Sequence, residues 1–120
     1  MERHALYKRF KRLSWQQQLG HLASTLATIS TQAKIPQQDQ LTDHLLREAA
    51  LMIEWCATQV PPAFHWELAA MQRECLNWQK VFPVEAVRTL LAINTRHYSE
   101  RVLDMAGLLE TNETLSMANP

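Results

Sequence analysis

The chain has little glycine or proline, few cysteines and no long apolar run. Two of its 120 residues are Gly and five are Pro, too few for the many turns of a β-sandwich or barrel. No glycine-rich phosphate loop occurs, and the length of about one domain excludes a Rossmann enzyme with a second domain. The longest uninterrupted apolar run, Ala49 to Ile53, is too short to cross a bilayer.

The two cysteines, Cys56 and Cys75, are 19 positions apart, which is not the spacing of a metal or redox motif. Both fall on the apolar faces of predicted helices, so we expect them to be reduced, buried and slow to react. The basic N-terminus is not followed by an apolar stretch long enough for a secretory signal. These features favour a cytoplasmic protein.

Hydrophobic residues make up 47% of the chain and charged residues 20%, a composition that supports a buried core. Twelve basic and twelve acidic residues cancel, so the chain as a whole lacks the charge typical of a nucleic-acid-binding protein. Residues 1–12 are the exception, with a local net charge of +4. We call their five basic residues the basic segment: Arg3, Lys8, Arg9, Lys11 and Arg12.

Proline divides the chain into segments with helical periodicity. It occurs at Pro36, at Pro61 and Pro62, and at Pro83, and it fits the first turn of a helix better than the interior. Ser14 and Gln17 have the spacing of a capping box, which predicts a helix start there. The predicted helices cover residues 14–34, 39–60, 62–81 and 83–110.

Helices of similar length joined by short connections predict an all-α fold, an up-down-up-down antiparallel four-helix bundle over residues 14–110. Residues 1–13 are expected to add a short basic amphipathic helical extension, and residues 111–120 a flexible tail. Apolar residues recur at spacings of three and four in each segment. In the last segment this predicted seam comprises Val84, Val87, Leu91, Asn94, Tyr98, Val102, Met105 and Leu109.

The predicted helix 14–34 is unusual because no residue from Leu13 to Ala33 is charged. Small residues on one side of this helix let a second helix approach closely. That second helix belongs either to the same bundle or to another subunit. The small residues are Gly20, Ala23, Ser24, Ala27 and Thr31.

The predicted helix 39–60 is apolar around most of its circumference, so either its own bundle or a partner encloses it. Trp66 points away from the seam of its helix, which leaves it either covered locally or available as an interface residue, where Trp and Arg are enriched. We therefore expect a homodimer or another protein partner. The predicted interface residues are Leu51, Trp55, Trp66 and Arg73.

One polar cluster is predicted between the last two helices. Asn94, His97 and Arg101 line one edge of their seam, and the hairpin register places Glu67 level with about residue 97. We expect Glu67 to contact His97 or Arg101, either as a structural link or as an anion-binding or acid–base site. No Glu-x-x-His occurs and segment 14–34 has no carboxylate, so we expect neither a metal site nor a cofactor.

The sequence most favours a non-enzymatic helical-bundle interaction or regulatory module. One alternative is a small-ligand- or anion-binding protein, or an enzyme, built on the cluster of Glu67, Asn94, His97 and Arg101. The other is a nucleic-acid accessory protein that acts through the basic segment, where Tyr7 and Phe10 offer limited base stacking. The same amphipathic segment also suits a membrane surface, an acidic partner or simple coverage of the bundle's end.

Overall fold

A computed structural model describes residues 2–108 of the chain. About 85% of these residues are helical and none is in a strand, which confirms the all-α prediction. The predicted tail 111–120 lies outside the described residues. Within the described range there are five α-helices: α1 (Glu2–Lys11), α2 (Trp15–Gln32), α3 (Asp39–Cys56), α4 (His65–Val81) and α5 (Arg88–Met105).

The helix ends differ from the predicted ranges at the connections. α3 ends at Cys56 instead of residue 60, because Pro61 and Pro62 have no backbone N–H to donate to the carbonyls of a preceding turn. Phe82 is extended, the backbone conformation that a following proline favours, and α5 begins at Arg88 instead of residue 83. Short 3-10 turns precede α3, α4 and α5 at Pro36–Gln38, Pro62–Phe64 and Glu85–Val87.

The start of α2 has the predicted capping box. The Ser14 hydroxyl oxygen accepts a hydrogen bond from the Gln17 backbone N–H at 3.1 Å, and the Gln17 side-chain oxygen accepts one from the Ser14 backbone N–H at 3.0 Å. Two donors that a helix start would otherwise leave unpaired are thereby satisfied. The cap lies between α1 and α2, and the basic segment ends before it, at Arg12.

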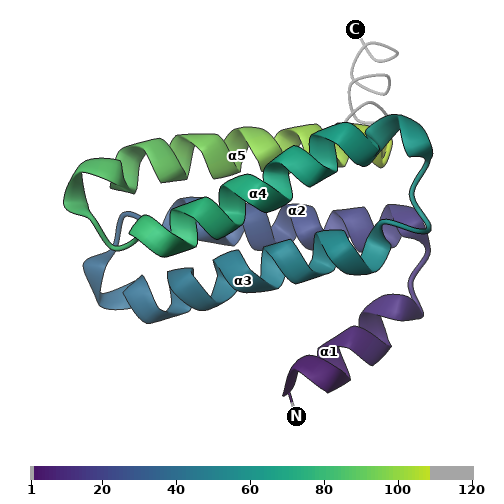
Figure 1. Cartoon of the computed structure of the whole chain (residues 1–120), viewed down its shortest axis with the longest axis horizontal. Helices are drawn as coiled ribbons and strands as arrows, with labels where there is room; N and C mark the ends of the chain where they lie inside the picture. Colours follow the sequence, from purple (N-terminus) through teal and green to yellow (C-terminus); the bar gives the residue numbers. More distant parts are fainter. Residues whose placement is uncertain (1, 109–120) are drawn as a thin grey trace, which may run out of the picture.

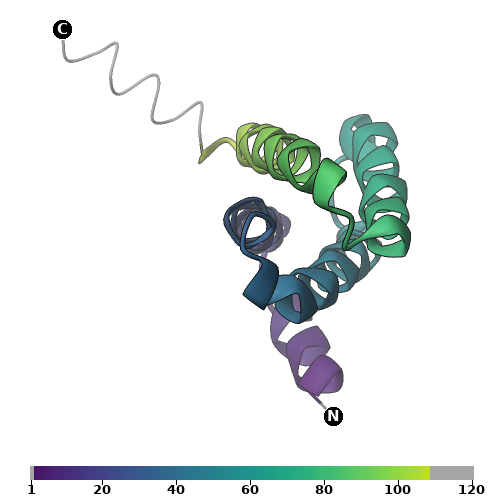
Figure 2. The same ribbon diagram turned by 90° about the vertical axis from the view of Figure 1, so that its left-hand side faces the viewer.

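α2 packs against α5 and against α3, and α3 also packs against α4. Figure 1 shows these four helices running along the long axis of the molecule, and Figure 2 shows them from one end. The core between them contains fully buried leucines from different helices, among them Leu19, Leu46 and Leu91. α1 is an additional helix that lies against α3.

The buried face of α5 is rotated from the predicted seam. Val84 is exposed and lies before the helix, and Asn94 and Tyr98 are only half-buried. Leu109 lies outside the described residues. The buried residues of α5 are Arg88, Leu91, Ala92, Thr95, Ser99, Val102 and Met105.

Close packing against α2 explains this rotation. The Ser99 hydroxyl donates to the Ala23 carbonyl at 2.8 Å, and the Ser30 hydroxyl donates to the Ala92 carbonyl at 2.6 Å. Small and hydroxyl-bearing residues therefore form the contact between α2 and α5. A pattern of large apolar residues does not reveal such a face, because the side chains that approach the neighbouring backbone are small and polar.

Candidate functional site

The predicted contact between α4 and α5 is present and joins Glu67 to Arg101. Arg101 Nε donates to Glu67 Oε2 at 2.7 Å, and Arg101 Nη2 donates to Glu67 Oε1 at 2.6 Å. Asp104, three residues further along α5, accepts a hydrogen bond from Arg101 Nη1 at 2.7 Å. We call Glu67, Arg101 and Asp104 the Arg101 cluster. Hydrogen bonds from Arg101 lower the pKa of Glu67 below its ordinary value of 4.5.

The Arg101 cluster is partly open to water. The exposed fraction is 39% for the Arg101 side chain and 44% for Glu67. Each guanidinium nitrogen of Arg101 already donates to a carboxylate. This arrangement favours a structural link between α4 and α5 over capture of an anionic ligand, since the ligand would have to displace a carboxylate.

Asn94 and His97, the other two residues of the predicted cluster, do not join these contacts. Asn94 is half-buried and His97 is exposed. Within the described residues neither side chain makes a hydrogen bond or an ion pair. The structure thus brings together only Glu67 and Arg101 of the four residues, and adds Asp104, which the sequence interpretation did not include.

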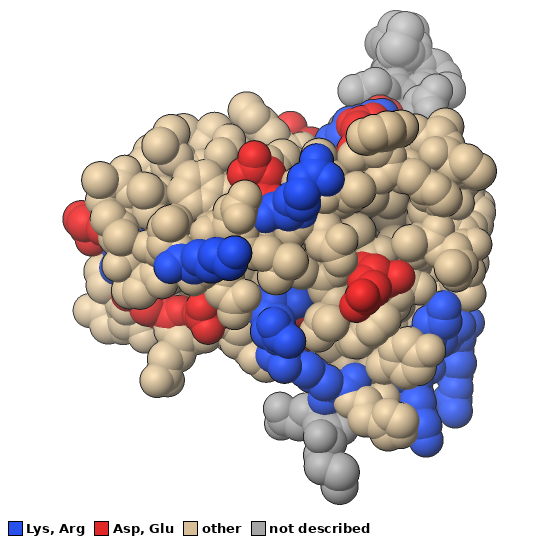
Figure 3. All heavy atoms as spheres, viewed as in Figure 1, with Lys and Arg blue, Asp and Glu red and all other residues tan. Residues whose placement is uncertain are grey.

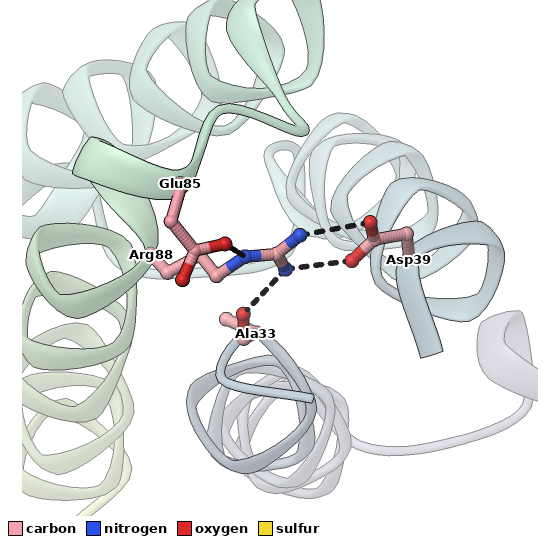
Figure 4. Close-up of polar contacts among 4 residues, drawn as sticks. All are labelled: Ala33, Asp39, Glu85 and Arg88. Atoms are coloured by element: carbon pink, nitrogen blue, oxygen red, sulfur yellow. Dashed lines mark hydrogen bonds and ion pairs between the residues drawn. The ribbon is translucent and has the colours of Figure 1, made fainter. Parts of the chain in front are cut away.

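A second cluster surrounds Arg88 at the first turn of α5 (Figure 4). Arg88 donates two hydrogen bonds to Asp39, from Nη1 to Oδ1 at 2.7 Å and from Nη2 to Oδ2 at 3.0 Å. Its Nε donates to Glu85 Oε2 at 2.7 Å, and its Nη1 also donates to the Ala33 carbonyl at 3.1 Å. The guanidinium carbon lies 5.3 Å from the centre of the Phe82 ring. We call Asp39, Glu85, Arg88 and the Ala33 carbonyl the Arg88 cluster.

The Arg88 cluster joins three parts of the chain at one end of the molecule. Ala33 follows α2, Asp39 begins α3 and Arg88 begins α5. The Arg88 side chain is only 10% exposed. Hydrogen bonds from Arg88 lower the pKa of Asp39, and this carboxylate together with Glu85 in turn raises the pKa of Arg88, so the group stays charged. Sequence reasoning missed this cluster.

Several cavities lie between helices, apart from both clusters. One of about 300 Å³ lies between α3 and α4, with Ile53 and Leu68 in its wall and Glu54 and His65 among its polar lining residues. Another, of about 280 Å³, lies between α2 and α5. Its lining residues are Ser30, Thr31, Lys34, Ala92, Ile93 and Arg96.

The predicted interface residues lie in different places. Trp66 is 83% exposed on α4, and Arg73 is also exposed there. Trp55 on α3 is half-buried beneath α1, with its ring 5.3 Å from that of Tyr7. Leu51, one turn before Trp55, is half-buried and lines a groove between α3 and α4. Of the four residues, Trp66 and Arg73 are exposed and both lie on α4.

The basic segment lies along α1 and the turn that follows it, and Arg9 lines a cavity between α1 and α2. Arg3, Lys8, Arg9 and Arg12 are exposed, whereas Lys11 is half-buried and donates to the Trp55 carbonyl at 3.1 Å. None of the five basic side chains makes an ion pair within the described residues. In the space-filling view, Lys and Arg side chains gather at the lower right of the molecule, where α1 lies (Figure 3).

Both cysteines are buried and unbonded, as expected from their positions. Burial raises the pKa of Cys56 to about 11 and that of Cys75 to about 12. Thiolate, the reactive form, is therefore scarce at neutral pH. Across residues 2–108, no group of three or more His, Cys, Asp or Glu side chains is placed to hold a metal ion.

Comparison with known protein families, with curated proteins and with solved structures finds no match to this chain. None of the helices described here is long and apolar enough to cross a membrane. Function is therefore inferred from the side chains and surfaces of this chain alone.

Proposed function

We propose that this protein is a non-enzymatic helical interaction module that acts as a homodimer through the outer side of α2 and α5. The observation that carries this proposal is the exposed side of α2, which has no Lys, Arg, Asp or Glu. The solvent-facing side of a helix carries charged or polar residues, and that of α2 carries polar and small residues alone. The exposed residues of α2 are Gln16, Gln17, His21, Ser24, Ala27, Thr28 and Thr31.

Exposed apolar side chains lie at both ends of this uncharged surface. Ile93 is 46% exposed and lines the cavity beside Thr31. Leu108 is also 46% exposed, and its Cδ1 atom lies 3.6 Å from the point where a Cβ on Gly20 would be. The surface that we call the α2–α5 face consists of Ser24, Ala27, Thr28, Thr31, Ile93, Arg96, Glu100 and Leu108.

A second copy of the chain is the partner that suits this face. In a dimer with twofold symmetry, residues near the axis meet their own equivalents, so a charge there would face a like charge. The exposed side of α2 avoids that repulsion. Arg96 and Glu100 lie one turn apart on α5, both exposed and not paired with each other. Across a twofold axis, the arginine of one copy can pair with the glutamate of the other.

Sedimentation equilibrium over the micromolar range tests this proposal. Wild-type protein is expected at twice the chain mass of 13.9 kDa. Ala27→Glu places a carboxylate in the middle of the α2–α5 face, where it meets the same group of the second copy, and is expected to give monomer. A wild-type monomer throughout the range would contradict the proposal.

Asn77→Glu is the matched control. Asn77 is exposed on α4, outside the α2–α5 face, and the substitution adds the same negative charge to a helix. This variant is expected to remain a dimer. Equal dissociation of both variants would show that net charge, and not the α2–α5 face, governs association. Thermal unfolding monitored by circular dichroism checks that both variants remain helical.

We further propose that α2 to α5 form the up-down-up-down four-helix bundle expected from the sequence, with α1 appended to it. The contacts of α2 with α3 and α5, and of α3 with α4, support this arrangement. The ion pair between Glu67 of α4 and Arg101 of α5 supports contact between the remaining pair. Long-range distances between spin labels on α4 and α5 would test it.

A further inference from the structure

The cations of α1 differ from the arginines of α5 because they have no carboxylate partners. Arg88 and Arg101 each bind two carboxylates. Arg3, Lys8, Arg9 and Arg12 are exposed and make no ion pair within the described residues. α1 contains one acidic residue, Glu2, against four basic residues. Their positive charge is therefore available to a partner.

α1 is held against the rest of the protein by its apolar side. Phe10 is 1% exposed, and its ring lies 5.8 Å from that of Trp55 and 6.1 Å from that of His21. The Gln18 side-chain amide donates to the Phe10 carbonyl at 3.1 Å. An amphipathic helix that binds a membrane inserts its apolar side into the lipid. That side of α1 is already buried in protein, which disfavours a membrane as the partner.

Tyr7 supplies an exposed aromatic ring on the side of α1 that faces Trp55 of α3. Its side chain is 40% exposed, and Trp55 contacts it edge-on, with ring centres 5.3 Å apart and an interplanar angle of 74°. The contact orients the ring but leaves part of it open to solvent. A positively charged surface with an oriented aromatic ring is the combination that single-stranded nucleic acids bind, by phosphate contact and base stacking. Phe10, the other aromatic residue of the helix, is buried and cannot take part.

We propose that the exposed residues of α1 and Arg12 bind single-stranded nucleic acid, with Arg3, Lys8, Arg9 and Arg12 contacting phosphates and Tyr7 stacking on a base. From Arg3 to Arg12 there are nine residue steps, which at the rise of a helix span about 14 Å. That length corresponds to roughly four phosphates at a spacing of about 3.4 Å along a stacked strand. The surface therefore suits a short stretch of strand, bound without base-specific readout.

Fluorescence anisotropy with a labelled oligothymidine tests the proposal. Four phosphate contacts predict that the logarithm of the association constant falls with the logarithm of salt concentration with a slope of about −3. Changing Arg3, Lys8, Arg9 and Arg12 together to Gln is expected to weaken binding at least tenfold and to flatten this slope. No binding by the wild-type protein at low salt would overturn the proposal.

The chain offers a control with the same change in net charge. Lys34, Arg47, Arg73 and Lys80 are also exposed and without ion pairs in the described part of the chain, but lie outside the basic segment. Changing these four to Gln is expected to weaken binding less than threefold. Equal losses in the two quadruple variants would overturn a site on α1. Circular dichroism shows whether both variants retain the wild-type helix content.

Further binding measurements distinguish single-stranded nucleic acid from other ligands. Tyr7→Ala is expected to weaken binding of the oligothymidine roughly fivefold or more, and Tyr7→Phe to retain it, because stacking needs the ring and not the hydroxyl. A DNA duplex is expected to bind more weakly than the single strand, since its bases are not open to Tyr7. Tighter binding to the duplex, or binding to phosphatidylserine vesicles without binding to the oligothymidine, would overturn the proposal.

Discussion

The Arg88 and Arg101 clusters use the same contacts in different surroundings. In each, an arginine of α5 makes a pair of hydrogen bonds to a carboxylate on another helix, Asp39 or Glu67. Each arginine also binds a second carboxylate three residues away along the chain. The exposed fraction of the side chain separates them, at 10% for Arg88 and 39% for Arg101.

This difference shows that a list of ion pairs does not reveal which ones hold a fold together. Water screens the Arg101 cluster, and exposed ion pairs contribute little to stability. Arg88 is largely shielded, and it also donates to the Ala33 carbonyl just beyond α2. Its loss would leave that carbonyl and Asp39 without their partner, which is more costly than losing an exposed pair. We therefore expect the Arg88 end of the molecule to be the more firmly held.

The largest effect is expected for Arg88→Met. It removes the positive charge and every hydrogen bond of the Arg88 cluster, and should lower the melting temperature by roughly 10 °C. Arg101→Met should lower it by only about 3 °C, since water replaces the lost contacts. Arg88→Lys serves as a control, because it keeps the charge but cannot form the paired contact with Asp39. Its melting temperature should lie between those of the wild type and Arg88→Met. Equal losses for Arg88→Met and Arg101→Met would break the comparison.

A smaller loss, of roughly 5 °C, is expected for Asp39→Asn, because Arg88 retains Glu85. The pKa of Asp39 is lowered by Arg88 from an ordinary value of 3.8. The ion pair therefore stabilises the fold fully above about pH 4, and this stabilisation is lost as the pH falls through the lowered pKa. Urea unfolding as a function of pH should show a shallower loss of stability below pH 4 in Asp39→Asn than in the wild type. An equal loss of stability below pH 4 in the two proteins would contradict a stabilising role of the Asp39 carboxylate.

The helices themselves could be predicted from the sequence because their signals are local. Spacings of three and four residues marked the apolar faces, and Ser14 with Gln17 marked the start of α2. The helix ends were less accurate, since the prolines are followed by 3-10 turns that have no periodicity of their own. The rotation of α5 was missed because Ala92, Thr95 and Ser99 are buried by close approach to α2 and not by hydrophobicity.

The Arg101 cluster could be predicted in part from the sequence, whereas the Arg88 cluster could not. Glu67 and Arg101 lie on the edges of apolar faces in consecutive helices, so the hairpin register was enough to bring them together. Asp39 is 49 residues from Arg88 in the sequence, and their contact depends on where the connection from α2 to α3 places the first turn of α3. The spacing of apolar residues in the sequence does not indicate where that turn lies. The spacing of Glu85 and Arg88 was the only local signal.

Glu67→Gln should have a smaller effect than either Arg88→Met or Asp39→Asn. The side chain is 44% exposed, so the expected loss is about 0.5–1 kcal/mol, equivalent to a few degrees of melting temperature. Because Arg101 lowers the pKa of Glu67, the stabilisation of the fold by this ion pair should be present above about pH 4.5 and lost at lower pH. Urea unfolding of both proteins at neutral pH and at pH 3 measures this. A loss of stability as large as that of Arg88→Met would mean that the packing of α4 depends on the contact between Glu67 and Arg101.

The smallest expected effect is the salt dependence of the two pairs, measured as the coupling energy in double-mutant cycles. One cycle combines Glu67→Gln with Arg101→Gln, and the other combines Asp39→Asn with Arg88→Gln. At about 1 M salt the Debye length is about 3 Å, so charges that water can reach are strongly screened. The coupling of Glu67 with Arg101 should fall close to zero there. The coupling of Asp39 with Arg88 should keep more than half of its low-salt value, because ions do not readily reach a side chain that is only 10% exposed. A parallel decrease of both couplings would show that the difference in exposure between the two arginines does not decide their contribution.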